Sequence, residues 1–265
     1  MIGVFDSGIG GLTVVKELFN VLPEYKIIYF GDTARLPYGT KSPELIKKFS
    51  KEIVNFLLKK GAKVIIIACH TSSSIATDFL RKNFKNIPIF EMTDPAIKEV
   101  LKISKDSKNK NIGVIGTPAT IKSQVYNKKL LHRDNTLKIY SQSCPLFVPL
   151  VEEGWIDTKE TKEIARKYLS GLQKKKISSL VLGCTHYPVL KNIISEIIGE
   201  KVAIINPGKD LVIEFKNFLE NNKKIEKSLK KGKGSHQFFV SDNPYNFKIM
   251  SKLCLGKEIN AKIIK

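Results

Sequence analysis

The stretch LVLGCTHYP at residues 180–188 decides the fold, together with its counterpart VIIIACHTSSS at 64–74. Each begins as an apolar run rich in β-branched residues and ends abruptly at a cysteine followed by small polar residues. Such a run is typical of a strand buried on both faces of a parallel sheet, and the turn after its carboxyl end is where these sheets place their chemistry. The pattern predicts two strands that each deliver one thiol, Cys69 and Cys184, to a functional site.

The chain carries a weak internal repeat around these two stretches. IGVF at 2–5 is repeated as NIGVI at 111–115. The number of residues from Gly3 to Cys69 is nearly the same as that from Gly113 to Cys184. In the first half, strands and helices alternate as far as a predicted strand at 87–90, which implies a parallel sheet with right-handed crossovers. We therefore expect an α/β protein with two pseudosymmetric α/β domains, mainly parallel sheets, and an active-site cleft between them.

The last sixty residues predict how the chain returns. KVAIINPG at 201–208 predicts a strand and a turn, and a long basic helix is expected near 209–230. The glycine-containing linker KKGKGSH then leads to HQFFVSDNP and a final short helix. We expect this segment to pack back onto the first domain. The predicted domains are 1–92 with 207–265, on the Cys69 side, and 93–206, on the Cys184 side.

Composition excludes several classes of protein. The chain has 265 residues, of which 42% are hydrophobic, and no apolar run approaches the ~18 residues of a membrane helix. The opening MIGVFDSG does not resemble a signal peptide, so we expect a cytoplasmic protein without a membrane partner. The four cysteines form no C-x-x-C pair, which argues against a zinc ribbon and a disulfide framework, and no other metal-ligand spacing is present.

The formal net charge of +20 invites comparison with nucleic-acid-binding proteins. The lysines are scattered over predicted helix surfaces and loops, they far outnumber the arginines that base readout favours, and no nucleic-acid motif accompanies them. We interpret the charge as a solvated surface that helps to attract an anionic substrate, and we do not expect nucleic acid as a partner. A nucleic-acid or gyrase-binding protein remains the alternative from a different functional class.

The glycine-rich turn at 6–14, DSGIGGLTV, leaves a second alternative open. Gly8 and Gly10 fit the G-x-G-x-x-G dinucleotide fingerprint, but its third glycine is Thr13 here, and Asp6 lies where a phosphate would approach. Asp32, at the end of the next predicted strand, could imitate the acid that binds a ribose. The same turn could also serve only for tight packing between strand and helix.

The two thiols differ from the other cysteines in their surroundings. A thiol at a strand-to-helix turn lies near helix N-terminal amides, which stabilise the thiolate, so we expect lowered pKa values for Cys69 and Cys184. Cys144 and Cys254 are expected to be buried structural residues.

Three titratable residues are candidates to assist the thiols. They are Asp6, His186 and one of Glu152 and Glu153. His186 follows Cys184 by two residues and could orient it or share a proton with it, although a structural histidine fits the spacing equally well. His70 adjoins Cys69, but adjacent side chains in a tight turn often point apart, so we do not assign it as the base.

Seven motifs together resemble the glutamate racemases of the aspartate/glutamate racemase superfamily, and they span essentially the whole chain. LGCTHYP at 182–188 and the opening FDSGIGGLTV at 5–14 are the most specific of them. The motifs are FDSGIGGLTV at 5–14, GDTARLPYG at 31–39, ACHTSS at 68–73, IGTPAT at 115–120, CPLFVPLVEEG at 144–154, LGCTHYP at 182–188 and FFVSDNPYNF at 238–247.

The resemblance implies the interconversion of L- and D-glutamate without a cofactor, which supplies D-glutamate for peptidoglycan. It also implies a homodimer. Removing the α-proton from one face of an amino acid and returning one to the other needs two acid/base groups, and two pseudosymmetric thiols fit that requirement. A related racemase that acts on aspartate or another amino acid is the nearest alternative.

The resemblance also implies roles for individual residues. Cys69 and Cys184 would be the catalytic acid/bases, with Asp6 assisting Cys69, and Glu152 and His186 assisting Cys184. The family usually has asparagine after its first cysteine, and the amide of that asparagine contacts the substrate. This chain has His70 there, so the substrate contact at this position and the specificity that it confers are open. The implied substrate contacts are Asp6, Ser7, Pro37, Tyr38, Gly39, His70, Thr71, Thr117, Thr185 and His186.

Overall fold

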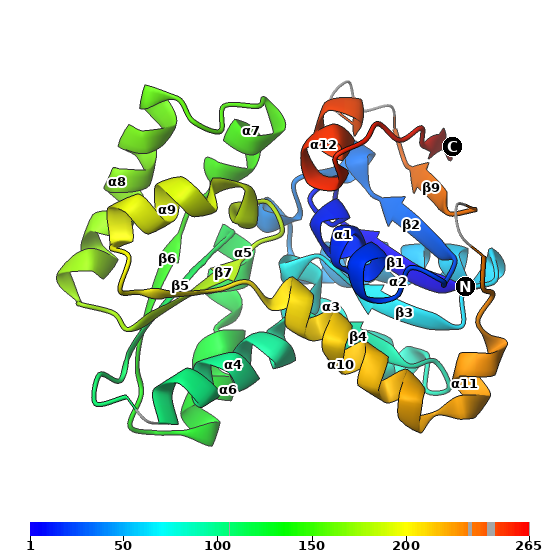
Figure 1. Ribbon diagram of the computed structural model, residues 1–265, viewed down its shortest axis with the longest axis horizontal. Helices are drawn as coiled ribbons and strands as arrows, with labels where there is room; N and C mark the ends of the chain where they lie inside the picture. Colours follow the sequence, from blue (N-terminus) through cyan, green and yellow to red (C-terminus); the bar gives the residue numbers. More distant parts are fainter. Residues whose placement is uncertain (106, 233–234, 243–246, 265) are drawn as a thin grey trace.

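The computed structural model describes residues 1–105, 107–232, 235–242 and 247–264. Two sheets lie side by side, each flanked by helices (Figure 1). The first has the strand order β10-β9-β2-β1-β3-β4 and the second β6-β5-β7-β8, and all their pairings are parallel. The predicted α/β fold with two parallel sheets is confirmed. Residues 233–234 of the predicted linker and 243–246 of the last motif lie outside the described residues.

The strands of the first sheet come from both ends of the chain, and those of the second from its middle. The first sheet contains β1 (Ile2–Asp6), β2 (Ile27–Gly31), β3 (Val64–Ile67), β4 (Ile89–Glu91), β9 (Gln237–Val240) and β10 (Lys262–Ile263). The second contains β5 (Asn111–Gly116), β6 (Lys138–Ser143), β7 (Ser179–Gly183) and β8 (Ala203–Ile205). We propose the domain boundaries 1–92 with 207–265, and 93–206, on this division.

Helices cover both faces of each sheet, because successive side chains of a buried strand point to opposite faces. Ile2 and Val4 of β1 face a core shared with α1, α10 and α12, whereas Phe5 faces the core under α2 and α3. In the second sheet, Val114 faces α4 and α6, whereas Ile115 faces α7, α8 and α9. The helices are α1 (Leu12–Val21), α2 (Pro43–Lys59), α3 (His70–Asn83), α4 (Thr93–Lys105), α5 (Pro118–Ser123), α6 (Val125–Arg133), α7 (Phe147–Glu152), α8 (Lys159–Lys174), α9 (Lys191–Ile198), α10 (Pro207–Asn221), α11 (Lys223–Ser228) and α12 (Phe247–Leu255), with 3₁₀ turns η1 (Thr33–Arg35), η2 (Tyr38–Thr40) and η3 (Tyr187–Leu190).

The two sheets repeat one topology, and this repetition places the candidate site. From β1 the chain moves to β2 on one side and then to β3 on the other, and from β5 it moves to β6 and then to β7 in the same way. Strand order therefore reverses between β1 and β3, and between β5 and β7. In open α/β sheets, ligands bind beyond the carboxyl ends of the strands at this point. The thiols lie there, with Cys69 after β3 and Cys184 after β7.

The structure corrects two predicted element boundaries. The strand expected at 87–90 is β4, Ile89–Glu91. The long helix expected near 209–230 is two helices, because Asn222 has the non-helical angles φ −128° and ψ 65° and ends α10 before α11 begins. The returning segment does join the first sheet, since β9 pairs with β2. No helix within the described ranges is both long and apolar enough to cross a membrane.

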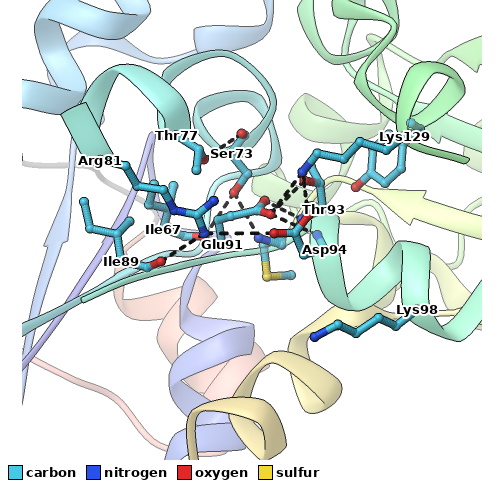
Figure 2. A network of polar contacts seen from close by, with 12 residues as sticks. Ile67, Ser73, Thr77, Arg81, Ile89, Glu91, Thr93, Asp94, Lys98 and Lys129 are labelled. Atoms are coloured by element: carbon cyan, nitrogen blue, oxygen red, sulfur yellow. Dashed lines mark hydrogen bonds and ion pairs between the residues drawn. The ribbon is translucent and has the colours of Figure 1, made fainter. Parts of the chain in front are cut away.

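A polar network around the buried Glu91 carboxylate fixes the crossover between the two sheets (Figure 2). Glu91, at the end of β4, is 2% exposed and accepts hydrogen bonds from the Thr93 hydroxyl (2.8 Å) and the Asp94 amide (2.9 Å) at the start of α4. Lys129 of α6 places its Nζ atom 2.6 Å from Asp94 Oδ1 and 3.5 Å from Glu91 Oε1. Burial raises the pKa of Glu91, and the charge of Lys129 opposes that rise. The network therefore ties α6 to the end of the first sheet.

Lys129→Met is expected to lower the free energy of unfolding by about 1–3 kcal/mol. It removes the cation beside the buried Glu91 carboxylate and leaves Asp94 with the Arg81 guanidinium, 4.0 Å away, as its remaining ion-pair partner among the described residues. Lys129 is 36% exposed, which keeps the loss below that of a fully buried pair. Urea denaturation measures it. The matched control is Lys128→Met, since Lys128 is the exposed neighbour on the same helix. Equal stability of the two variants would show that the network does not hold α6.

Candidate active site

The two thiols line one small cavity between the sheets. Nearly all of the predicted substrate contacts line it, and Leu36 and Val148 complete the wall. Its volume is about 20 Å³, which is room for little more than a water molecule, so the cleft is closed and an amino acid enters only when its walls separate. The predicted residues that line it are Ser7, Pro37, Tyr38, Gly39, Cys69, His70, Thr71, Thr117, Cys184, Thr185 and His186.

Cys69 sits at the N-cap of α3, as its strand-to-helix turn requires. Its Sγ atom accepts a hydrogen bond from the Ser72 amide at 3.4 Å and donates to the Ser7 hydroxyl at 3.5 Å. The expected lowering of its pKa is wrong. Complete burial and the charge of Asp6 raise the pKa of Cys69 to about 11, and they outweigh the opposing bonds from Ser7 and Ser72. The Cys69 thiol is therefore protonated at neutral pH.

Cys184 has different neighbours. No α-helix begins at this cysteine, since the short 3₁₀ turn η3 follows three residues later, and the predicted helix amides are absent here. The Sγ atom lies 3.7 Å from Nδ1 of His186, and Nε2 of His186 lies 3.0 Å from Oε1 of Glu152. Glu152 thus faces His186, whereas Glu153 is exposed at the end of α7.

His186 is an imidazolium at neutral pH. Burial alone would lower its pKa, but its hydrogen bonds to Cys184 and Glu152, together with their charges, raise the pKa of His186 to about 10. A cation 3.7 Å from a sulfur favours negative charge on that sulfur. The surroundings of the two thiols therefore differ in charge. Cys69 is buried near the Asp6 carboxylate, which favours the protonated thiol, whereas Cys184 lies beside the His186 cation.

Asp6 lies behind the cavity and not on its wall. It is fully buried and accepts hydrogen bonds from the Gly8 amide (2.9 Å) and the Thr185 hydroxyl (3.3 Å). Burial raises the pKa of Asp6, whereas the charge of His186 and the amides of Gly8 and Gly11 oppose that rise. Asp6 therefore acts on Cys69 through its charge, and it fixes the Thr185 hydroxyl.

The loop from β2 to α2 carries Tyr38, whose hydroxyl is not available to a substrate because it donates to Asp32. Asp32 is fully buried and also accepts hydrogen bonds from Arg35 Nε (3.0 Å) and Ser241 Oγ (2.8 Å). A carboxylate with these partners cannot bind a ribose, so the structure gives no support to the dinucleotide alternative. Asp32 instead holds the β2–α2 loop, which closes the cavity.

Sequence reasoning missed two side chains that join the halves of the cleft. Thr120 of α5 completes a cluster with Thr71 (3.2 Å) and Thr117 (3.0 Å), and Thr71 also meets Thr117 at 2.9 Å. Tyr126 of α6 places its hydroxyl 2.8 Å from Nδ1 of His70. Thr120 belongs to the IGTPAT motif, and its place in that motif is a signal from which it could have been predicted as a site residue. Nothing in the sequence around Tyr126 indicates a site.

A second cavity, of about 220 Å³, adjoins the first and shares part of its wall. Glu152 lies in its wall, together with four prolines from the β2–α2 loop, α5 and the start of α7. The space between the loop and α7 is therefore the approach to the thiols. Within the described chain, no group of three or more His, Cys, Asp or Glu side chains could hold a metal ion.

Gly10→Ala is expected to lower activity about 100-fold, because small displacements of reacting groups have effects of this size. The added methyl group would overlap the Thr185 hydroxyl and lie 2.6 Å from Nδ1 of His186. The control is Gly171→Ala in α8, where a methyl group meets nothing within 4 Å. It should raise stability by about 1 kcal/mol and leave turnover unchanged. Equal turnover of the two variants would refute this packing of the cleft.

Comparison with known proteins agrees with this geometry. The family model described as Asp/Glu/Hydantoin racemase matches residues 3–212. The glutamate racemase of Geobacter metallireducens is 40% identical over 258 residues, which is 97% of this chain and 93% of that protein. The crystal structure of glutamate racemase from Francisella tularensis in complex with D-glutamate has a TM-score of 0.91 at 39% identity and covers 100% of this chain and 97% of that chain.

An aspartate racemase is a more distant neighbour. The structure of Picrophilus torridus aspartate racemase has a TM-score of 0.53 at 18% identity, and covers 88% of this chain and 95% of that chain. This likeness shows the shared fold alone. None of these relatives favours the nucleic-acid alternative.

Proposed function

This chain belongs to the Asp/Glu/Hydantoin racemase family, and we propose that it interconverts L- and D-glutamate with two thiols and no cofactor. One observation carries the proposal: two thiols from topologically equivalent strand ends line one closed cavity, each with its own polar neighbours. The identity with glutamate racemases over nearly the whole chain supports glutamate as the substrate over aspartate.

In the proposed reaction one thiol acts as the acid and the other as the base. Cys184, beside the His186 imidazolium, takes the α-proton from one face of the substrate, and the protonated Cys69 delivers its proton to the other face. The Cys184 sulfur then carries the substrate's original proton, and Cys69 is left as a thiolate that Ser7 and the Ser72 amide stabilise. The opposite enantiomer reacts from this second state, so the catalyst returns to its starting form.

The main barrier is the weak acidity of the α-carbon. Negative charge that develops on the substrate must be stabilised by groups already oriented toward it, in a site from which water is excluded. The closed cavity excludes water, and the hydroxyls of Thr71, Thr117 and Thr185 lie in its wall beside the His186 imidazolium. The net charge of +20 also favours the approach of an anionic amino acid.

The product points to a cellular role and an assembly. D-glutamate is a building block of peptidoglycan, so the enzyme supplies cell-wall synthesis. We further infer a homodimer, for which the exposed apolar side chains on either side of α7, Leu146 (47%) and Trp155 (49%), provide contact surface. Light scattering on the purified chain tests the dimer, and a monomer at all concentrations would refute it.

Proton exchange tests the function directly. The protein is incubated with L-glutamate or D-glutamate in deuterated water, without added cofactor, while proton NMR follows the α-proton and circular dichroism follows inversion. We expect exchange accompanied by racemisation from either enantiomer. Activity on aspartate but not on glutamate would show that aspartate is the substrate. No exchange with either amino acid would overturn the proposal, and salt-dependent DNA binding that survives loss of both thiols would support the nucleic-acid alternative.

A further inference from the structure

A hydrogen bond between α3 and α6 ends at the cavity. His70, the first residue of α3, and Tyr126, near the start of α6, are each 2% exposed. The Tyr126 hydroxyl lies 2.8 Å from Nδ1 of His70. The two side chains come from helices on different sheets, so this bond forms only when the two halves of the molecule lie together.

The environment decides which atom carries the proton. Burial lowers the pKa of His70 to about 3, so the ring is neutral and has one N–H. Burial raises the pKa of Tyr126 well above its ordinary value, so its hydroxyl keeps its proton. Among the described residues, Nδ1 of His70 is the hydrogen-bond partner of that hydroxyl. A buried hydroxyl proton needs an acceptor, so Tyr126 donates, Nδ1 accepts, and the ring proton is on Nε2.

The Nε2 atom is then the free end of the ring. His70 lines the cavity with both thiols, and its ring makes no other hydrogen bond within the described part of the chain. Nε2 is not among the fully enclosed side-chain atoms that lack a partner in the described part of the chain, which are the hydroxyls of Ser74 and Ser179. Nε2 therefore keeps accessible surface, and we infer that it faces the cavity that His70 lines.

We propose that Tyr126 is a positioning residue, which holds His70 as the Nε2–H tautomer so that the ring donates one neutral hydrogen bond to a carboxylate of the substrate. The inference rests on the proposed function for the identity of that carboxylate. An asparagine amide at position 70 would offer its donors without a fixed tautomer and would not need Tyr126. In this chain the donor depends on α6, which Lys129, one turn beyond Tyr126, ties to Glu91 and Asp94.

Nitrogen NMR tests the tautomer without relying on activity. The chain has four histidines, so long-range ¹H–¹⁵N spectra of ¹⁵N-histidine-labelled protein are simple, and His70→Asn identifies the signals of His70. We expect a protonated Nε2 and a hydrogen-bonded, unprotonated Nδ1, and Tyr126→Phe should remove the hydrogen-bond shift of Nδ1. A proton on Nδ1 in the unaltered protein would overturn the inference, whether or not the protein racemises glutamate.

Kinetics test the consequence for the substrate. Tyr126→Phe is expected to raise KM for glutamate about five- to tenfold with kcat nearly unchanged, because the lost bond serves binding in the ground and transition states alike. In a His70→Asn background the same substitution should have no further effect. The control is Tyr140→Phe, on the half-buried tyrosine of β6. Equal effects of Tyr126→Phe in both backgrounds would refute the coupling.

Discussion

Replacing either Cys69 or Cys184 with serine is expected to lower kcat/KM for racemisation about 10³-fold, because a serine hydroxyl is too weak an acid to exchange protons with the α-carbon. Both thiols are free and buried in one cavity. If each serves one face of the substrate, each variant keeps one functional base. It should then exchange the α-proton of one enantiomer with deuterium without inverting it, and the two variants should prefer opposite enantiomers.

The cysteines outside the cavity provide the matched control. Cys254→Ser makes the same atomic change at a buried thiol of α12, away from the cavity wall. It should cost stability, which a thermal melt measures, and leave exchange from both enantiomers intact. Loss of exchange from the same enantiomer in both active-site variants would contradict the assignment of one thiol to each face.

The parts of the site that could be predicted from sequence are those with local signals. The apolar, β-branched runs before Cys69 and Cys184 end at the turns where the strands end, because a doubly buried strand cannot continue into polar residues. Repetition of this pattern, and the motifs around it, was enough to predict two parallel sheets. Strand order then brought both turns to one cavity without any further signal.

The parts that could not be predicted depend on burial and on contacts between distant segments. The helix-end signal at Cys69 favours the thiolate, but its full desolvation is a property of the closed cleft and reverses the direction of its pKa. Tyr126 meets His70 across 56 residues of chain, and only the docking of α6 creates that contact. The resemblance indicated Glu152, but the residue pattern alone could not distinguish it from Glu153, because α7 is a helix of six residues whose phase composition does not reveal.

Glu152→Gln is expected to lower kcat/KM about 10- to 100-fold at neutral pH, because it removes the charge that keeps His186 protonated. The amide oxygen can still accept the hydrogen bond that now spans 3.0 Å between Nε2 and Oε1, so the geometry is conserved and the charge is not. The pKa of His186, now raised to about 10, then falls. The alkaline loss of activity should therefore begin at a lower pH, and exchange of the enantiomer whose α-proton Cys184 removes should be affected most.

The same change has a signature in stability that needs no substrate. A histidine whose folded pKa of about 10 exceeds its unfolded value of 6.5 stabilises the protein fully below pH 6.5, and this stabilisation is lost as the pH rises through 10. The gap in melting temperature between the unaltered protein and Glu152→Gln should therefore be widest near pH 6 and close above pH 10. Glu153→Gln, at the exposed neighbour, should show no such gap. A gap that does not change with pH would mean that Glu152 stabilises the protein through packing and hydrogen-bond geometry, and that its charge does not raise the pKa of His186.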